Sequence, residues 1–178
     1  PYSGGVDALC PTGSCQVQVG AARSKGAELE LNAKPTESLT LIAGYAYTDA
    51  RVTQSTLTGQ VVGDELPNSP RNTFHVWTRY DVLSGPLRGF GAGLGFVYVG
   101  DRVANTGTAA IPGEFMLPAY EVVDLGLYKQ FANGLDVTLK INNLFDETYY
   151  QDGTIASGMV SIDAGTPRDA ELYLKYTF

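Results

Sequence analysis

The sequence predicts an all-β protein: a segment of an antiparallel, up-and-down transmembrane β-barrel. Apolar and polar residues alternate with the two-residue period of a strand along most of the chain. Short and long connections between the predicted strands also alternate, without exception. Helical patterns are almost absent, because no segment keeps apolar residues at the i, i+3, i+4 and i+7 positions over several turns.

The alternation is plain in the first predicted strand, where Ala27, Leu29 and Leu31 alternate with Glu28 and Glu30. The same period returns in six later segments, so each predicted strand has an apolar face and a more polar face. The seven predicted strands, each with one residue of its apolar face, are 16–33 (Leu29), 38–52 (Leu41), 71–83 (Val76), 88–101 (Leu94), 119–131 (Leu125), 135–149 (Leu139) and 167–178 (Leu174).

Turn chemistry separates these strands. The sequence Ala132-Asn133-Gly134 fits a tight hairpin, because Asn and Gly adopt the positive φ that such a turn requires. Short turns are predicted at 34–38, 83–87 and 132–134, and long loops at 1–15, 53–70, 102–118 and 150–166. In an up-and-down sheet this order places the short turns at one end and the long loops at the other, which is typical of outer-membrane barrels.

Three details favour a membrane barrel over a soluble β-sandwich binding domain, which also alternates. The predicted strands exceed the usual ~5–6 residues and reach the ~9–11 residues of a tilted spanning strand. Charged residues such as Arg79, Asp136 and Lys140 lie within strands, where a water-filled lumen accepts them. Aromatic residues gather near strand ends, as in interfacial girdles: Tyr45, Tyr47, Trp77, Tyr80, Tyr98, Tyr149, Tyr150, Tyr176 and Phe178.

Composition narrows the function classes. The chain has 178 residues, of which 44% are hydrophobic, so it is not a disordered tail. Its net charge of −7 argues against a nucleic-acid partner, which would demand a basic face. No apolar run reaches the ~18–20 residues of a membrane helix, and we find no signal-peptide pattern.

We expect the chain to be the C-terminal part of a larger barrel. Seven is an odd number of strands, whereas bacterial single-chain barrels have even numbers, and seven strands alone would leave two unpaired edges. The start at Pro1 agrees with a piece of something longer. The alternative is a complete small barrel with a further strand hidden in 1–15, a region whose Pro and Gly residues suit a strand poorly.

The two cysteines, Cys10 and Cys15, lie in the sequence Cys-Pro-Thr-Gly-Ser-Cys. This spacing is too long for a redox Cys-x-x-Cys motif, and no neighbouring His or second Cys pair completes a zinc site. We predict a short disulfide that closes a surface loop, in an oxidising compartment. The alternative is a pair of free thiols in a flexible loop.

Four motifs follow one another along the chain. They are Ser24-Lys25-Gly26-Ala27-Glu28, Leu66-Pro67-Asn68-Ser69-Pro70-Arg71-Asn72-Thr73, Leu117-Pro118-Ala119-Tyr120-Glu121-Val122-Val123-Asp124 and Ile141-Asn142-Asn143-Leu144-Phe145-Asp146-Glu147-Thr148-Tyr149-Tyr150. Together with an aromatic last residue, Phe178, they resemble the barrel of TonB-dependent outer-membrane siderophore receptors. The resemblance covers about residues 23–178, and the ferric-hydroxamate (ferrichrome-like) group is the most similar in character.

The resemblance implies a plugged barrel of about 22 strands, of which 1–178 would be the C-terminal portion and 1–15 an outer loop. It implies that a ferric siderophore binds from outside and that TonB acts through an N-terminal plug domain, which these residues do not include. It also implies outer-membrane lipid and the barrel assembly machinery as partners. Phe178, with Tyr176, would be the terminal signal that this machinery reads.

For ligand binding, position alone selects five residues of the outer loops and upper lumen: Arg102, Phe115, Tyr120, Tyr149 and Tyr150. The plainer interpretation is that they belong to the girdle or pack the loops. Because the iron would arrive already chelated, we expect no metal ligands and no cofactor of the protein's own. We also expect no enzyme activity, since no Gly-x-Ser-x-Gly motif occurs and His75 is the only histidine.

Two further patterns have structural interpretations that compete with functional ones. We expect the Asn142-Asn143-Leu144-Phe145-Asp146 cluster to satisfy backbone groups where a strand leaves the sheet, rather than to form a catalytic site. The glycines at 89, 91, 93 and 95 fail the Gly-x-Gly-x-x-Gly spacing, so we expect them to let a bulky neighbour approach the strand. That neighbour could be the plug.

Alternative functions remain at this stage. The chain could belong to a TonB-dependent receptor for cobalamin, haem or a sugar, although haem uptake usually needs histidine ligands. It could also be a small outer-membrane barrel with a structural or enzymatic role.

Overall fold

The structure is a computed structural model that describes residues 2–3, 16–17, 20–55, 61–107, 112–156 and 159–178. Its main sheet comprises β3 (Gly20–Ala33), β4 (Leu39–Ser55), β5 (Asn72–Asp81), β6 (Phe90–Val99), β9 (Tyr120–Gln130), β10 (Leu135–Asn142) and β13 (Asp169–Tyr176). The other strands form two-stranded pairs: β1 (Tyr2–Ser3) with β2 (Gln16–Val17), β7 (Arg102–Gly107) with β8 (Pro112–Leu117), and β11 (Tyr150–Ala156) with β12 (Met159–Ala164).

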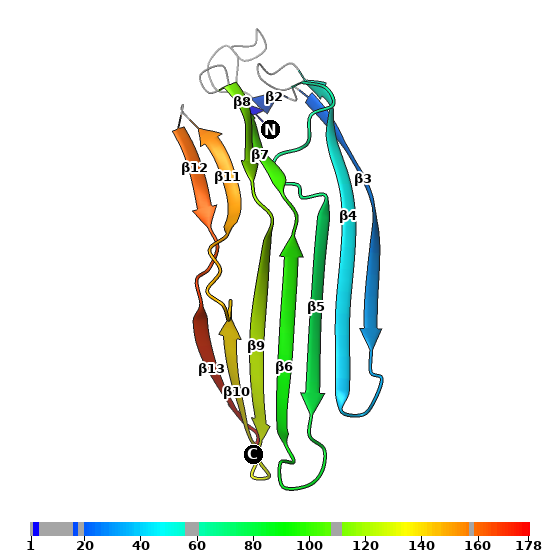
Figure 1. Ribbon diagram of the computed structural model, residues 1–178, viewed down its shortest axis with the longest axis vertical. Coiled ribbons are helices and arrows are strands. Elements are labelled where there is room, and N and C mark those ends of the chain that lie inside the picture. Colours follow the sequence, from blue (N-terminus) through cyan, green and yellow to red (C-terminus); the bar gives the residue numbers. More distant parts are fainter. Residues whose placement is uncertain (1, 4–15, 18–19, 56–60, 108–111, 157–158) are drawn as a thin grey trace.

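The main sheet is a seven-stranded antiparallel meander in the order β13-β10-β9-β6-β5-β4-β3 (Figure 1). All seven predicted strands are therefore confirmed, in the predicted order. Short turns join the strands at one end, and the longer connections lie at the other end, where the β7–β8 and β11–β12 hairpins project beyond the sheet (Figure 1). Among the described residues, no helix is long and apolar enough to span a membrane.

The structure differs from the prediction at one strand end and in two loops. The sequence predicts the sixth strand over 135–149, but β10 ends at Asn142, because Asn143 and Asp146 adopt positive φ values of 49° and 58° and turn the chain out of the sheet. The connections at 102–118 and 150–166 were expected to be plain loops, yet each contains a hairpin. Register shifts interrupt both hairpins, so the regular alternation that marks the main strands is weaker there.

One face of the sheet carries continuous rows of apolar side chains. Cross-strand pairing places four apolar residues opposite one another in turn: Ala43, Val76, Phe96 and Val123. Large apolar residues of this face are exposed, among them Leu29, Leu94, Leu172 and Leu174. Such a continuous apolar surface does not suit water, whereas it suits the hydrocarbon layer of a membrane.

Aromatic side chains mark both ends of this apolar face. Near the outer end, Phe74 pairs with Tyr45 on one side and with Tyr98 on the other. Near the short turns, the Lys129 Nζ atom lies 3.8 Å from the centre of the Phe90 ring. These two belts have the positions expected of interfacial girdles.

One residue predicted for the aromatic girdle, Trp77, lies on the opposite face of the sheet. The sequence prediction places Trp77 in the belt with Tyr80, but three positions separate the two residues on β5, so their side chains point to opposite faces. Trp77 instead lies over Gly93 and Gly95: a Cβ atom built at these glycines would approach its ring to 2.6 Å and 2.8 Å, respectively. The expectation that the glycines admit a bulky neighbour is confirmed at these two positions, and the neighbour is a side chain of the adjacent strand.

Candidate functional site

The outer end of the molecule contains most of the buried side chains that the structure describes. Val103, Ala104 and Leu117 are buried where the β7–β8 hairpin meets β11. The packing requires a glycine at 153, because a Cβ atom there would lie 2.9 Å from the Ala104 Cβ and 3.1 Å from the Phe115 Cε1. The outer segments thus pack against each other around a small apolar core.

Arg102 lies beside this core, at the start of β7, and only 2% of it is exposed. Its Nη2 atom donates hydrogen bonds to the carbonyl oxygens of Tyr150, at 2.8 Å, and Gln151, at 2.7 Å. Its Nη1 atom is buried without a hydrogen-bond partner among the described residues. An arginine in this state has a hydrogen-bond donor left to offer to an anionic or carbonyl oxygen.

Two tyrosines continue the cluster. The rings of Tyr120 and Tyr149 have centroids 4.5 Å apart and an interplanar angle of 33°. The Arg102 guanidinium carbon lies 5.7 Å from the centre of the Tyr120 ring, within cation–π range. The structure therefore brings together four of the five residues predicted for ligand binding, Tyr150 through its carbonyl group. The fifth, Phe115, packs against Gly153 beside Ala104 and Leu117, in the apolar core of the outer segments.

A cleft of about 320 Å³ opens beneath the tyrosines. Its lining mixes aromatic, apolar and charged side chains: Val97, Tyr120, Val122, Asp124, Lys140, Asn142, Asn143, Tyr149, Thr166 and Asp169. The lining residues that belong to the main sheet lie on the same face as Trp77 and Arg79. The cleft therefore lies on the face opposite the apolar rows. Within the described chain, no ion pair is found for Lys140, whereas the Asn142 Nδ2 atom donates to the Asp169 Oδ2 at 2.9 Å.

Asn143, at the edge of this cleft, is a structural residue, as the sequence predicted. It is 2% exposed, and its amide hydrogen bonds go to backbone groups: Nδ2 donates to the carbonyls of Glu147 and Thr166, and Oδ1 accepts from the Glu147 N–H. Its own N–H donates to the Asp124 Oδ1 at 2.9 Å. These bonds replace the ladder that β10 loses where it leaves the sheet.

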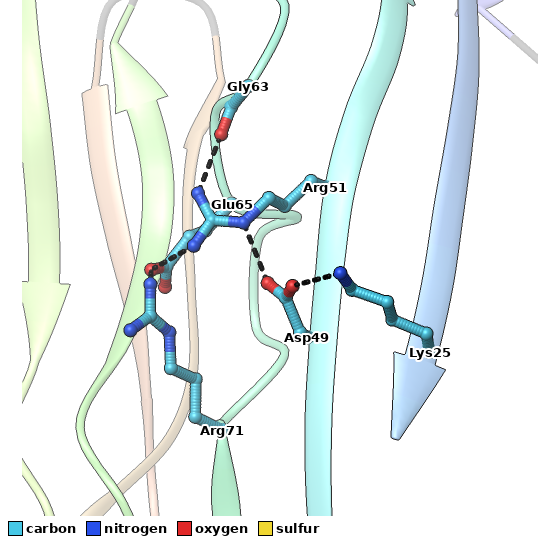
Figure 2. Close-up of polar contacts among 6 residues, drawn as sticks. All are labelled: Lys25, Asp49, Arg51, Gly63, Glu65 and Arg71. Carbon is cyan, nitrogen blue, oxygen red and sulfur yellow. Dashed lines mark hydrogen bonds and ion pairs between the residues drawn. The ribbon is translucent and has the colours of Figure 1, made fainter.

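A second polar cluster, which sequence reasoning missed, lies on the outer part of β3 and β4 (Figure 2). The Arg51 Nε atom donates to the Asp49 Oδ1 at 2.7 Å, and its Nη1 donates to the Gly63 carbonyl at 2.9 Å. Lys25 pairs with Asp49 at 3.5 Å, while Glu65 pairs with both Arg51 and Arg71. The network ties the segment 61–65 to the end of β4.

The electrostatic effect of this network is clearest at Asp49. The hydrogen bond from Arg51, together with the charges of Arg51 and Lys25, holds the pKa of the Asp49 carboxyl below its ordinary value, although burial opposes the shift. Asp49 lies beyond Tyr47, the last residue of β4 that pairs with β5, and so outside the span of the seven-stranded sheet. The sequence does not predict this network, because its charges come from three segments that are distant in sequence: β3, β4 and the connection from β4 to β5.

The remaining predicted residues lie elsewhere. The disulfide predicted between Cys10 and Cys15 falls outside the described residues. Tyr176 and Phe178 are exposed at the short-turn end, with ring centroids 6.1 Å apart, and nothing in the structure tests their role as an assembly signal. No group of three or more His, Cys, Asp or Glu side chains within the described ranges has the arrangement of a metal site.

Comparison with known families decides what this sheet is. A family model described as "TonB dependent receptor-like, beta-barrel" matches residues 2–144, which is most of the chain. The chain belongs to the TonB-dependent receptor β-barrel family. Members of this family are β-barrel receptors and transporters of the outer membrane rather than enzymes, so the predicted fold class and location are confirmed.

Curated relatives agree with this assignment. The metal-pseudopaline receptor CntO of Pseudomonas aeruginosa is 33% identical over 92% of this chain and 22% of its own length. The ferrioxamine B receptor of Salmonella typhimurium is 37% identical over 74% of this chain and 18% of its own length. The ferrichrome outer membrane transporter/phage receptor of Escherichia coli is 31% identical over 78% of this chain and 18% of its own length. The chain thus spans about a fifth of the length of these relatives.

Solved structures support the fold. The siderophore receptor PiuA of Acinetobacter baumannii aligns with a TM-score of 0.73 at 24% identity, over 88% of this chain and 22% of that one. The ferric yersiniabactin uptake receptor FyuA of Yersinia pestis aligns with a TM-score of 0.75 at 16% identity, over 90% of this chain and 24% of that one. Both alignments cover less than a quarter of the solved chain, and both support the fold of this part.

Proposed function

We propose that this chain is the C-terminal part of the barrel wall of a TonB-dependent receptor that imports a ferric siderophore. The observation that supports this proposal most strongly is the sequence similarity to receptors for ferrioxamine B and ferrichrome. The rest of the barrel and an N-terminal plug domain would complete the receptor, and TonB would act through that plug. Outer-membrane lipid would cover the apolar face, and the barrel assembly machinery would insert the strands.

The outer cluster suits recognition of a ferric chelate. Aromatic faces at Tyr120 and Tyr149 offer contact area to a ligand body, and Lys140, which lines the same cleft, suits an oxygen of negative character. The iron would arrive within its chelate, so this mechanism needs no metal ligand or cofactor from the protein. Binding followed by gated passage, rather than a chemical reaction, would be the activity.

Growth and uptake measurements test the proposal. A strain that lacks the full-length gene would take up ⁵⁵Fe-labelled ferrichrome or ferrioxamine B poorly, and the gene on a plasmid would restore uptake in a TonB-dependent manner. Restoration by the gene in a strain without TonB would contradict energisation through TonB. Equal uptake with and without the gene would exclude these two ligands as substrates.

A second candidate substrate is metal-pseudopaline, since the relative that binds it matches 92% of this chain. The same deletion strain distinguishes the candidates when it is supplied with metal-loaded pseudopaline in place of the two siderophores. Uptake of that complex alone would replace the ferric-siderophore proposal with this one.

A further inference from the structure

Asn68 lies where three outer segments of the chain meet. It belongs to the connection between β4 and β5, and its backbone N–H donates to the Val103 carbonyl of β7 at 2.7 Å. Its side-chain Nδ2 donates to the Gly153 carbonyl of β11 at 3.1 Å, and its Oδ1 accepts from the Gly153 N–H at 3.3 Å. One residue therefore bonds to both projecting hairpins.

The chemistry of asparagine explains this junction. The φ of Asn68 is 55°, in the left-handed region that Asn tolerates better than most residues with a side chain. Its amide carries a donor and an acceptor in one plane, so it can pair with a strand as a peptide group would. Gly153 presents its N–H and C=O toward the same edge of β11, which matches this planar pair.

A second side chain holds the same hairpin. The Arg102 Nη2 atom donates to the carbonyls of Tyr150 and Gln151, at the start of β11. On its other edge β11 pairs with β12. The side chains of Asn68 and Arg102 thus make hydrogen bonds to β11 in the place of a neighbouring strand. Because residue 153 is a glycine, the β7–β8 hairpin can pack closely against β11 there. Tyr149 directly precedes β11, and its own carbonyl accepts a hydrogen bond from the Gly165 N–H at 2.7 Å. The contacts that hold β11 therefore bear on the place of Tyr149 against Tyr120.

We propose that Asn68 is a positioning residue that joins the three outer segments into one unit and thereby fixes Tyr149 against Tyr120. Asn68 does not line the cleft beneath the tyrosines, so it acts on a ligand through β11. The part of this inference that concerns a ligand rests on the proposed function. The part that concerns the junction does not, since it can be measured without any ligand.

Hydrogen exchange of the full-length receptor in detergent tests the junction. The variant Asn68→Gly keeps the left-handed backbone but removes the amide. The control Asn133→Gly removes an exposed amide from a turn at the opposite end, at a residue without positive φ. Because the two side-chain hydrogen bonds to Gly153 are lost, we expect exchange in peptide 150–156 to become about tenfold faster in Asn68→Gly. Peptide 102–107, whose bond to the backbone N–H of residue 68 remains, should change less. The control variant should leave both peptides unchanged. If Asn68→Gly changes only the segment 61–70, the junction is refuted.

Equilibrium binding tests the effect on a ligand, with ferrichrome and ferrioxamine B as probes. We expect Asn68→Gly to raise the Kd of the bound probe about tenfold, since it loosens one wall of the site. Asn68→Asp keeps the acceptor for the Gly153 N–H but sets a carboxylate oxygen against the Gly153 carbonyl, so it should raise the Kd as well. A higher Kd in both variants with an unchanged thermal unfolding temperature would separate lost positioning from general destabilisation, and an unchanged Kd would contradict the positioning role.

The outcomes separate the two proposals. If the parent receptor binds neither probe, the proposed function fails for these ligands, and hydrogen exchange still decides the junction. If exchange becomes faster while the Kd stays the same, Asn68 joins the segments without positioning the site, and the ligand part of the inference is wrong.

Discussion

At the scale of single residues, amide side chains shape the connections outside the sheet. Asn143 and Asn68 both have positive φ values, and in both the side-chain amide hydrogen-bonds to backbone groups of another segment. Neither position requires a function to explain its amide, although Asn143 also borders the cleft. A polar residue beside a predicted site can therefore be one that builds the site rather than one that touches the ligand.

Replacement of Asn143 by alanine should destabilise the receptor strongly. The buried side chain makes three hydrogen bonds, and at about 1 kcal/mol each their loss lowers the free energy of unfolding by about 3 kcal/mol. Thermal unfolding of the full-length receptor measures the change. Asn32→Ala, in an exposed position of β3, is the matched control and should change stability little. If both substitutions lowered the free energy of unfolding equally, the Asn143 hydrogen bonds would not be a specific source of stability.

Acid should weaken the side-chain link between the segment 61–65 and the end of β4, while backbone hydrogen bonds such as that from the Gly63 N–H to the Val52 carbonyl remain. The pKa of Asp49 is lowered in the folded protein, so its contribution to stability is present above the unfolded pKa of about 4 and is lost as the pH falls through the folded value. Hydrogen exchange of this segment, compared at neutral pH and below pH ~4, would show the weakening. In Asp49→Asn the segment should already exchange faster at neutral pH. An identical acid response in parent and variant would contradict the role of Asp49.

At the scale of elements, the strands carry two different surfaces. Leu94 and Leu125 share one face, which under the proposed function would meet lipid, whereas Trp77, Arg79 and Lys140 share the opposite face, which would turn inward. On the inward face the Arg79 guanidinium lies 3.9 Å from the centre of the Tyr128 ring and pairs with Asp81 at 2.9 Å. Charges on this face therefore have partners or an aqueous lumen, which the lipid face cannot offer.

A single charge should distinguish the two faces. Leu125→Arg places a cation near the middle of β9 on the lipid face, at a cost of about 2–4 kcal/mol, so the amount of assembled receptor should fall. Thr138→Arg places the same charge on the inward face, where we expect near-normal assembly. The heat-modifiable band of the receptor in outer-membrane fractions measures both variants. A greater loss for Thr138→Arg would reverse the assignment of the faces.

At the scale of the whole molecule, the sheet is one sector of a wall. Among the described strands, β3 and β13 each have a neighbour on one side only. The chain spans about a fifth of its curated relatives, so strands of the remaining barrel would pair with these edges. That pairing would also shield the lumen face, where Glu28 and Glu30 lie exposed on β3.

The native protein should therefore be several times longer than these 178 residues. An antibody against the region of Phe178, used on fractionated cells, should detect it in the outer membrane, in larger amounts under iron starvation. A band of about the size of this chain would instead support a small complete barrel. A soluble band would contradict the membrane assignment.

The fold could be predicted well because its determinants are local. The alternation of Leu29 with Glu28 and Glu30, and turn residues such as Asn133 and Gly134, act between neighbours in sequence. These local patterns determine how many strands form, in which order they pair, and which side chains lie on each face of the sheet. The prediction failed where the pattern was applied past its end, at 143–149, and where a girdle was assigned to Trp77 against its own alternation.

The candidate site could be predicted only as a set of positions. The sequence predicts that Arg102, Tyr120 and Tyr149 lie in the outer region. Arg102 is 18 positions before Tyr120, and Tyr120 is 29 positions before Tyr149, so no local pattern indicates that they touch. The tertiary structure brings them together, through hydrogen bonds that Asn68 and Arg102 make to β11. Strands and faces follow from the sequence by itself, since a two-residue period is a property of one strand. The arrangement of the outer segments follows only from the folded molecule, since it depends on contacts between distant parts of the chain.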